Sequence, residues 1–380
     1  MSVLNASPED SHLESAPIKD DKLLVASQWQ LIRWKFVRHR VAVLSLIVLI
    51  IFYLSAIFAE FVAPYDPGHY DADLTLAPPQ LLHFFDNGRF QWRPFVYGVS
   101  SEYDLNTFKT TYTVDESLKY PIRFFAKGDP YKLWGLFPSD RHLFGVEEGT
   151  VFLFGSDNMG RDVLSRVIHG GRVSLSIGLL GIAISSLIGI FVGGISGYYG
   201  GVTDVIIQRV IEFIRSIPTL PLWMALSVAL PPTWTILQVY FGIVMILSLV
   251  GWTGLARVVR GKFMSLREED FVMAAQLNGS TEIRTIFKHM LPSFYSHVIA
   301  SLTLSVPGMI LGETALSFLG LGLQAPAVSW GVLLRDAQFI RVLASSPWLL
   351  LPGGFVVLAI LCFNFVGDGL RDAADPYATI

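Results

Sequence analysis

Residues 173–203 read VSLSIGLLGIAISSLIGIFVGGISGYYGGVT and contain no Asp, Glu, Lys or Arg. Roughly 20 apolar helical residues cross the hydrocarbon core of a bilayer, because a helix satisfies its own backbone polar groups. The stretch is therefore predicted to be a membrane-spanning helix. Gly189, Gly193, Gly194 and Gly197 recur in it at nearly helical spacing, which favours close packing against another helix over a pore lining.

The rest of the chain has the same apolar character. Of its 380 residues, 52% are hydrophobic and 16% are charged, and the mean hydropathy is +0.51. These values exclude a water-soluble enzyme as the default class. With 28 basic and 31 acidic residues, net charge indicates neither nucleic-acid binding nor acidic disorder. The one cysteine, Cys362, provides neither a disulfide framework nor a thiolate metal site within this chain.

Charge-free stretches and proline breaks predict six spans and an all-α polytopic membrane protein. Pro231 and Pro232 divide a stretch that is too long for one span, and Pro352, Gly353 and Gly354 predict a kink in the last span. The predicted spans are 41–59, 173–203, 205–230, 236–256, 298–321 and a segment between 341 and 368.

Basic residues set the predicted orientation, because short cytoplasmic loops are rich in Lys and Arg. Arg33, Lys35, Arg38 and Arg40 precede the first span, and a second basic group follows the fourth span. An even number of crossings separates the two groups, so both are predicted to be cytoplasmic, as are both termini. The second group consists of Arg257, Arg260, Lys262, Arg267, Arg284 and Lys288.

The predicted division has five parts. Residues 1–40 are a polar cytoplasmic leader without signal-peptide order, 41–63 the first span, and 64–171 an external segment. Residues 172–370 hold five spans with a cytoplasmic loop at 257–292, and 371–380 form a cytoplasmic tail. The external segment contains many aromatic residues and can bury a modest core. Short strands are predicted at 110–114 and 120–125.

The loop after the fourth span predicts two short helices that meet at a bend. Acidic residues begin the first helix, and Asn278-Gly279 ends it, since glycine adopts the left-handed conformation that closes a helix. Ile283, Ile286, Phe287, Met290 and Leu291 predict one apolar face of the second helix, with Arg284, Thr285 and Lys288 away from it. Small residues, Ala274 and Ala275, lie beside Phe271 and suit docking into another protein's groove. The alternative is an amphipathic helix on the bilayer surface.

These residues carry a family resemblance. Ala274-Ala275, Gly279 and Leu291-Pro292 are spaced as in the EAA loop of permease subunits of bacterial ABC importers, although Met273 and His289 depart from the family pattern. A second segment, residues 154–175, resembles the signature before the second span in the dipeptide and oligopeptide branch, which also includes nickel and opine permeases. Residues 308–322 and 367–376 resemble the same branch, and the C-type subunit is implied. The signature residues are Gly155, Asp157, Gly160, Arg161, Asp162 and Arg166.

The resemblance implies a type I ABC importer permease fold with an enlarged external insert at about 70–150. It implies as partners a second homologous permease subunit, two ABC ATPase subunits and an external solute-binding protein, in the bacterial cytoplasmic (inner) membrane. Phe271, Ala274, Ala275, Gly279, Ile283, Leu291 and Pro292 would form the loop that couples to the ATPases. Arg161 and Asp162 are predicted to form a tight external turn with Asp157, which is a structural role.

The chain itself is predicted to be no enzyme and to bind no cofactor or metal. A P-loop needs Gly, four residues and then Gly-Lys-Ser/Thr. Around Gly261-Lys262, Ala256 occupies the position of the first glycine and Phe263 the position of the Ser or Thr. ATP and Mg²⁺ would be used by the ATPase subunits. No metal-binding His-Glu-x-x-His motif occurs. An active site in the insert is the weakest alternative, because no catalytic constellation stands out there.

Glu313 lies within the fifth predicted span. A carboxylate there is either a functional group of the translocation pathway or a structural group that is hydrogen-bonded to a neighbouring helix. The predicted function is import of oligopeptides or similarly sized solutes by alternating access. Alternatives are oligosaccharides, opines or nickel as cargo, or a secondary transporter or channel in which Glu313 is the coupling residue.

Overall fold

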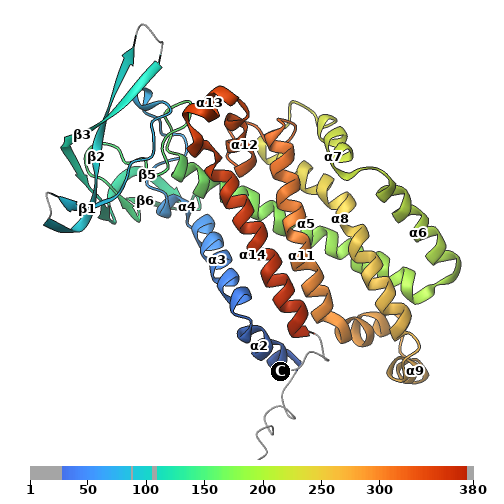
Figure 1. The fold of residues 1–380 in the computed structure, drawn as a ribbon. Helices are drawn as coiled ribbons and strands as arrows, with labels where there is room; N and C mark the ends of the chain where they lie inside the picture. The colour runs from blue at the N-terminus through green and yellow to red at the C-terminus, as the bar shows by residue number, and fades with distance from the viewer. Residues whose placement is uncertain (1–27, 87–88, 105–108, 375–380) are drawn as a thin grey trace, which may run out of the picture.

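The computed structural model describes residues 28–86, 89–104 and 109–374. Most of the predicted leader and the end of the predicted tail lie outside these ranges. Figure 1 shows a bundle of long helices, with a group of small β-sheets at one end. The helices of the bundle are α2 (Gln28–Arg38), α3 (Arg40–Ile57), α4 (Ala59–Val62), α5 (Val163–Tyr199), α6 (Gly201–Ser216), α7 (Thr219–Val228), α8 (Ile236–Leu266), α11 (Tyr295–Phe318) and α14 (Leu351–Ala374).

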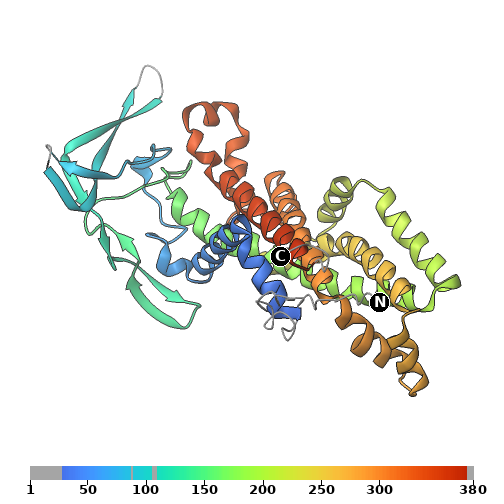
Figure 2. The ribbon, with the colours of Figure 1, turned by 60° about the horizontal axis from the view of Figure 1, so that its bottom comes forward.

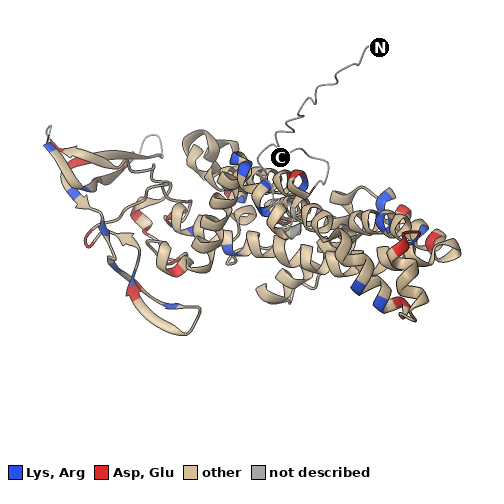
Figure 3. Cartoon of the chain, turned by 90° about the horizontal axis from the view of Figure 1, so that it is seen from below, with Lys and Arg blue, Asp and Glu red and all other residues tan. Residues whose placement is uncertain are grey.

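Five helices in the described part of the chain are long and apolar enough to cross a membrane, and α7 is a shorter apolar helix. The five correspond to the predicted first, second, fourth, fifth and sixth spans. Figure 3 shows the helical region as largely free of charge, whereas charged residues are frequent in the strands and at the opposite end of the bundle. The chain is therefore a helical, multi-pass membrane protein, and the count of six spans stays a prediction.

The third predicted span is not one helix. Ile217 is extended between α6 and α7, and Pro218 follows it. Proline disfavours the helical conformation of the residue before it and has no N–H for the helical ladder, so the chain breaks there. In Figures 1 and 2, α6 and α7 form an arm beside α8. The arm leaves many apolar side chains exposed, including Val202, Val205, Ile206 and Phe213.

The predicted break at Pro231 and Pro232 is confirmed, because α7 ends before them and α8 begins at Ile236. Thr235 and Gln238 cap α8 reciprocally, since each side chain bonds the other residue's backbone N–H. The predicted kink near Pro352 is wrong. Pro352 lies in the first turn of α14, where the missing N–H has no helical acceptor to lose.

Helices α5 and α8 pack closely through glycines, as the sequence predicted. A Cβ at Gly193 would lie 2.4 Å from the Ala256 carbonyl oxygen, and one at Gly197 would lie 2.6 Å from the Arg260 carbonyl oxygen. Asp204 at the start of α6 pairs with Arg260 of α8 at 2.5 Å. The main core lies among α3, α5, α8, α11 and α14.

The segment between α4 and α5 consists of strands and a short helix, η1 (Ala72–Leu74). The predicted strand at 110–114 is confirmed, as part of a longer strand that runs to Pro121. The second predicted strand, at 120–125, ends before Phe125, because Phe125 has positive φ. The sheets pair in the orders β1-β2-β3, β4-β7 and β5-β6, all antiparallel. The strands are β1 (His83–Asp86), β2 (Arg89–Asp104), β3 (Lys109–Pro121), β4 (Arg123–Phe124), β5 (Lys127–Leu133), β6 (Phe137–Arg141) and β7 (Phe144–Gly145).

Short helices connect the long ones at both ends of the bundle. Between α8 and α11 lie α9 (Asp270–Leu277), α10 (Glu282–Arg284), the π-helix η2 (Thr285–Met290) and η3 (Leu291–Phe294). Between α11 and α14 lie α12 (Trp330–Arg335), η4 (Asp336–Gln338), α13 (Ile340–Ser345) and η5 (Pro347–Leu350). In Figure 1, α2 and α9 lie at the end away from the sheets, whereas α12 and α13 lie at the end near them.

Candidate functional site

The bend between α9 and α10 has the predicted geometry. Gly279 has φ +75°, its N–H donates to the Gln276 carbonyl oxygen at 2.9 Å, and the Ser280 N–H donates to the Ala275 carbonyl oxygen at 3.0 Å. This is the double hydrogen-bond pattern that closes a helix with a left-handed glycine. The site is open, because a Cβ at Gly279 would have no neighbour within 4 Å.

The structure confirms only part of the predicted apolar face of the second helix. Ile286, Met290 and Leu291 are buried, whereas Ile283 and Phe287 are exposed. Thr285, predicted on the polar side, is fully buried and donates to the Thr281 carbonyl oxygen at 3.1 Å. The physical reason is the π-helix, whose i to i+5 hydrogen bonds change the angular spacing on which the prediction relied.

An apolar surface covers α9 and the bend, and we name it the loop surface. It consists of exposed side chains that α8 and α11 do not cover, namely Phe271, Met273, Ala274, Leu277, Ile283 and Phe287. Of the seven predicted loop residues, Phe271, Ala274, Gly279, Ile283 and Pro292 are exposed, and Ala275 and Leu291 are buried.

A buried cluster connects the loop surface to the long helices. Val272 of α9 shares this cluster with Val259 and Phe263 of α8 and with Met290 and Phe294 that lead into α11. The Phe263 and Phe294 rings meet edge to face at 5.5 Å. The cluster therefore packs α9 against both α8 and the segment that leads into α11.

Five of the six predicted signature residues lie in one compact turn before α5, and the sixth, Arg166, lies at the start of α5. Asp157 accepts hydrogen bonds from the Met159 N–H at 2.8 Å and from Arg161 Nε at 2.7 Å, and Arg166 Nε lies 3.5 Å from the same carboxylate. Gly160 has φ +78°, and a Cβ there would collide with the Asp71 carbonyl oxygen at 1.9 Å. Gly155 also has positive φ and no room for a Cβ.

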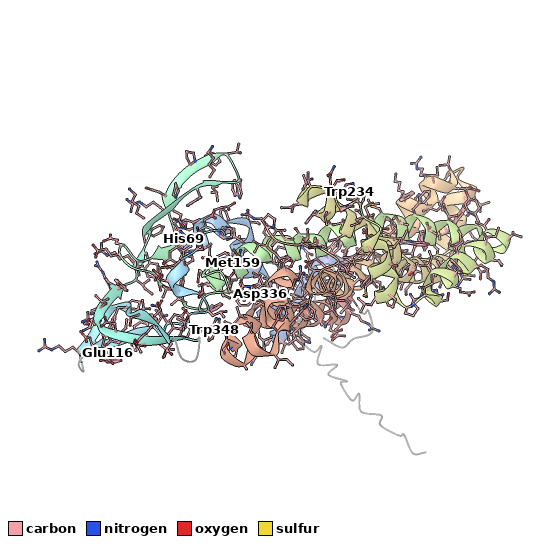
Figure 4. All side chains as sticks on the ribbon, turned by 90° about the horizontal axis from the view of Figure 1, so that it is seen from above. His69, Glu116, Met159, Trp234, Asp336 and Trp348 are labelled. Atoms are coloured by element: carbon pink, nitrogen blue, oxygen red, sulfur yellow. The ribbon has the colours of Figure 1, made fainter. Side chains whose placement is uncertain are left out.

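Asp162 caps α5 from a fully buried position. One of its oxygens accepts hydrogen bonds from the Ser165 N–H at 2.8 Å and the Ser165 hydroxyl at 2.6 Å. Burial raises the pKa of Asp162 to about 6, and the nearby Asp157 charge adds to this effect. Burial likewise raises the pKa of Asp336, which is bonded to Asn158 of the turn at 3.3 Å. Figure 4 shows Met159, Asp336 and Trp348 close together where the turn meets the helices.

Glu313 has a fully buried side chain in α11. The Ser174 hydroxyl of α5 donates to one carboxyl oxygen at 2.8 Å, and the Ser317 hydroxyl donates to the other at 2.9 Å. Ser174 also accepts from the Trp330 N–H at 3.1 Å, so the group joins α11, α5 and α12. This geometry is the one expected of the structural alternative.

Sequence reasoning missed two polar contacts that tie the helices together. Asp204 accepts hydrogen bonds from Arg260 and from the Ser196 hydroxyl, at the end of α8 that leads to the loop. The Ser196 oxygen in turn accepts a hydrogen bond from the Gln208 side chain. Ser174 is the partner of Glu313 but lies 139 residues away in sequence. The sequence indicated only that an acidic residue in an apolar segment needs a hydrogen-bond partner. It did not indicate which residue that partner is.

Comparison with known proteins identifies relatives. Residues 186–379 match the model of the family described as binding-protein-dependent transport system inner membrane component, and residues 27–79 match the N-terminal TM domain of oligopeptide transport permease C. The chain is 45% identical over 224 residues to the oligopeptide transport system permease protein OppC of Haemophilus influenzae, which covers 59% of this chain and 70% of that protein.

Two further relatives have similar names. The dipeptide transport system permease protein DppC of Bacillus subtilis is 40% identical over 225 residues, which cover 59% of this chain and 68% of that protein. A peptide permease protein of Brucella ovis is 37% identical over 267 residues, which cover 69% of this chain and 83% of that protein. These matches extend over most of each relative.

Proposed function

This chain belongs to the binding-protein-dependent transport system inner membrane component family, and from that premise we propose that it is the permease subunit of an ATP-driven oligopeptide importer. Relatives named for oligopeptide and dipeptide transport support this substrate class. The family works with an ATPase and a substrate-binding protein. The proposed full assembly adds a second homologous permease subunit and two ATPase subunits, and an external binding protein delivers the peptide.

The observation that carries the proposal is the loop surface. Its apolar side chains project from α9 and the bend at the end of the bundle that also holds the basic helix α2. A short helix with exposed apolar residues fits a groove of a partner protein. With basic residues on the cytoplasmic side, this surface would meet ATPase subunits in the cytoplasm, and both termini would lie there.

The proposed mechanism is alternating access driven through that surface. When the ATPases close on ATP and Mg²⁺, α9 moves with them, and the cluster of Val272, Phe263 and Phe294 carries the displacement to α8 and α11. These two helices would then expose the pathway to one side of the membrane at a time. The energy comes from the ATPases, and this chain supplies the packed connection.

The test is reconstituted uptake with a charge placed on the loop surface. Leu277 is 90% exposed, so Leu277→Asp should leave folding unchanged but weaken ATPase copurification and peptide uptake together. The matched control is Ile340→Asp, because Ile340 is 83% exposed on α13 near the other end of the bundle, and it should retain the ATPase. Normal ATPase retention and uptake in Leu277→Asp would refute the proposed coupling.

A second arm of the experiment identifies the cargo. Uptake of a labelled pentapeptide should require ATP and the binding protein, and unlabelled peptides should compete with it. Competition by an oligosaccharide, an opine or Ni²⁺ in place of peptides would assign one of the alternative cargoes. Uptake that persists without ATP and collapses with an ion gradient would instead indicate a secondary transporter.

A further inference from the structure

The β5–β6 hairpin ends in a bulky apolar turn. Leu133 pairs with Phe137, and Trp134, Gly135 and Leu136 form the tip between them. Trp134 has φ +53° and Gly135 has φ +74°, and the Leu136 N–H donates to the Leu133 carbonyl oxygen at 3.0 Å. Positive φ at both central residues is typical of a tight hairpin turn, but that position normally holds Asn, Asp or Gly. A tryptophan there is costly, so its ring must gain contacts elsewhere.

Those contacts lie at the end of the first span. Trp134 Nε1 donates to the carbonyl oxygen of Ile57, the last residue of α3, at 2.9 Å, and its ring lies 5.5 Å from the Phe58 ring. The base of the hairpin is held as well, because the Leu143 N–H donates to the Phe61 carbonyl oxygen at 2.7 Å. Figures 1 and 2 show the hairpin beside α4, where α3 ends. The tip therefore lies at the level where α3 leaves the hydrocarbon core.

The outer side of the tip is apolar and uncovered by this chain. Leu136 is 73% exposed, and Trp134 and Phe137 are at least half exposed. The neighbouring end of α3 also exposes Leu54 and Ile57, so the apolar surface of the span continues onto the hairpin. Exposed Lys132 lies beside the tip, and a cationic side chain at this level can reach lipid phosphates.

From this geometry we infer that the tip of the β5–β6 hairpin inserts into the outer headgroup region of the bilayer. Trp134, Leu136 and Phe137 would occupy the boundary between headgroups and acyl chains, where aromatic side chains are enriched in membrane proteins. Lipid is the occupant because the patch continues the lipid-exposed surface of a membrane span and lies at the depth of its end. The insertion would anchor the external strands against the membrane surface, in addition to their attachment at both chain ends.

The experiment places one fluorescent label at the tip and one far from it. The buried Cys362 is replaced by Ala, and single cysteines are introduced as Leu136→Cys and, as the control, Glu116→Cys on β3. Figure 4 shows Glu116 at the far edge of the external segment. The labelled full-length chain is assembled with its partner subunits in nanodiscs. Brominated lipids then quench a label within the bilayer, and iodide quenches a label in water.

The expected result is that brominated lipids quench the Leu136 label and iodide scarcely does, while the Glu116 label shows the reverse. Equal quenching of both labels by iodide would overturn the inference, because the tip would then lie in water. Protection of the Leu136 label from both quenchers would also overturn it and would assign the patch to a protein partner. Peptide uptake by each labelled variant verifies that the assembly is intact.

Discussion

At the scale of single residues, substitutions of Glu313 can distinguish a role of its charge from a role of its hydrogen bonds. Its carboxylate accepts from Ser174 and Ser317, and an amide in its place still offers an acceptor to one of them. We expect Glu313→Gln to retain assembly and most uptake. Glu313→Leu should lose stability, because each buried hydroxyl left without a partner costs about 1–3 kcal/mol.

Uptake and thermal stability of the purified complex measure the two variants. A Gln variant that assembles normally but is as inactive as the Leu variant would show that the charge itself is required. Such a result would return Glu313 to the predicted pathway role and away from the structural one.

Asp162 gives the turn before α5 a pH dependence of definite sign. Its folded pKa of about 6 lies above the ordinary Asp value of 3.8, so folding favours the protonated form. The stabilising contribution is complete below pH 3.8 and is lost as pH rises through 6, with an upper limit of about 3 kcal/mol. In thermal unfolding, Asp162→Asn should reduce the dependence of the melting temperature on pH between about pH 4 and 6. An unchanged slope in that variant would assign the pH dependence to another group.

At the scale of elements, Gly279 controls how α9 and α10 meet. Valine at φ +75° is disfavoured by about 1–2 kcal/mol, and its branches also thicken the exposed bend. Gly279→Val should therefore insert into the membrane normally but bind the ATPase weakly or hydrolyse ATP without uptake. Gly279→Asn tests the backbone alone, since asparagine tolerates this conformation, and it should remain coupled.

The matched control for this series is Gly261→Val. Gly261 is also exposed and has no neighbour within 4 Å of an added Cβ, but it lies within α8 and its φ is not positive. It should behave as wild type in ATPase retention and uptake. Wild-type behaviour of Gly279→Val as well would remove the bend from the coupling mechanism and favour a helix that only rests on the bilayer.

The sequence predicted those elements whose boundaries depend on local interactions, and it failed for elements that depend on contacts between distant residues. The end of α9 at Asn278-Gly279 was predictable because the signal is local, and the proline pair before α8 was equally clear. The π-helix at Thr285–Met290 was not, because no local pattern separates it from an α-helix. In the structure, Ile286 and Met290 lie in one buried cluster with residues of α8. The break at Ile217-Pro218 had a local signal that was missed because the surrounding apolar residues predicted an unbroken span.

Long-range contacts account for the rest of the difference. Glu313 is bonded to Ser174 of α5, which lies 139 residues away in the sequence, and Trp134 is bonded to Ile57 across 77 residues. No periodicity in the sequence encodes such pairs. The strands between α4 and α5 were underestimated because β2 and β3 are stabilised mainly by each other, and residues of mixed polarity fill both.

At the scale of the whole molecule, the topology makes a prediction of its own. Reporters fused at Lys22, Ser265 and Tyr377 should give cytoplasmic signals, and a reporter at Lys119 should give an external one, because basic residues mark one end of the bundle. Alkaline phosphatase and green fluorescent protein fusions measure the two sides. A cytoplasmic signal at Lys119 would contradict the orientation and the predicted number of crossings.

The α6–α7 arm bears on how a cell must produce this protein. The arm exposes Val205, Ile206 and Phe213, and the described part of the chain does not cover them. The folded subunit therefore has an exposed apolar face on this arm. Quality-control proteases of the membrane would meet that surface on every copy synthesised without its counterpart. We expect the cellular half-life of this chain to lengthen when the proposed second permease subunit is co-expressed, because that subunit would cover the exposed face.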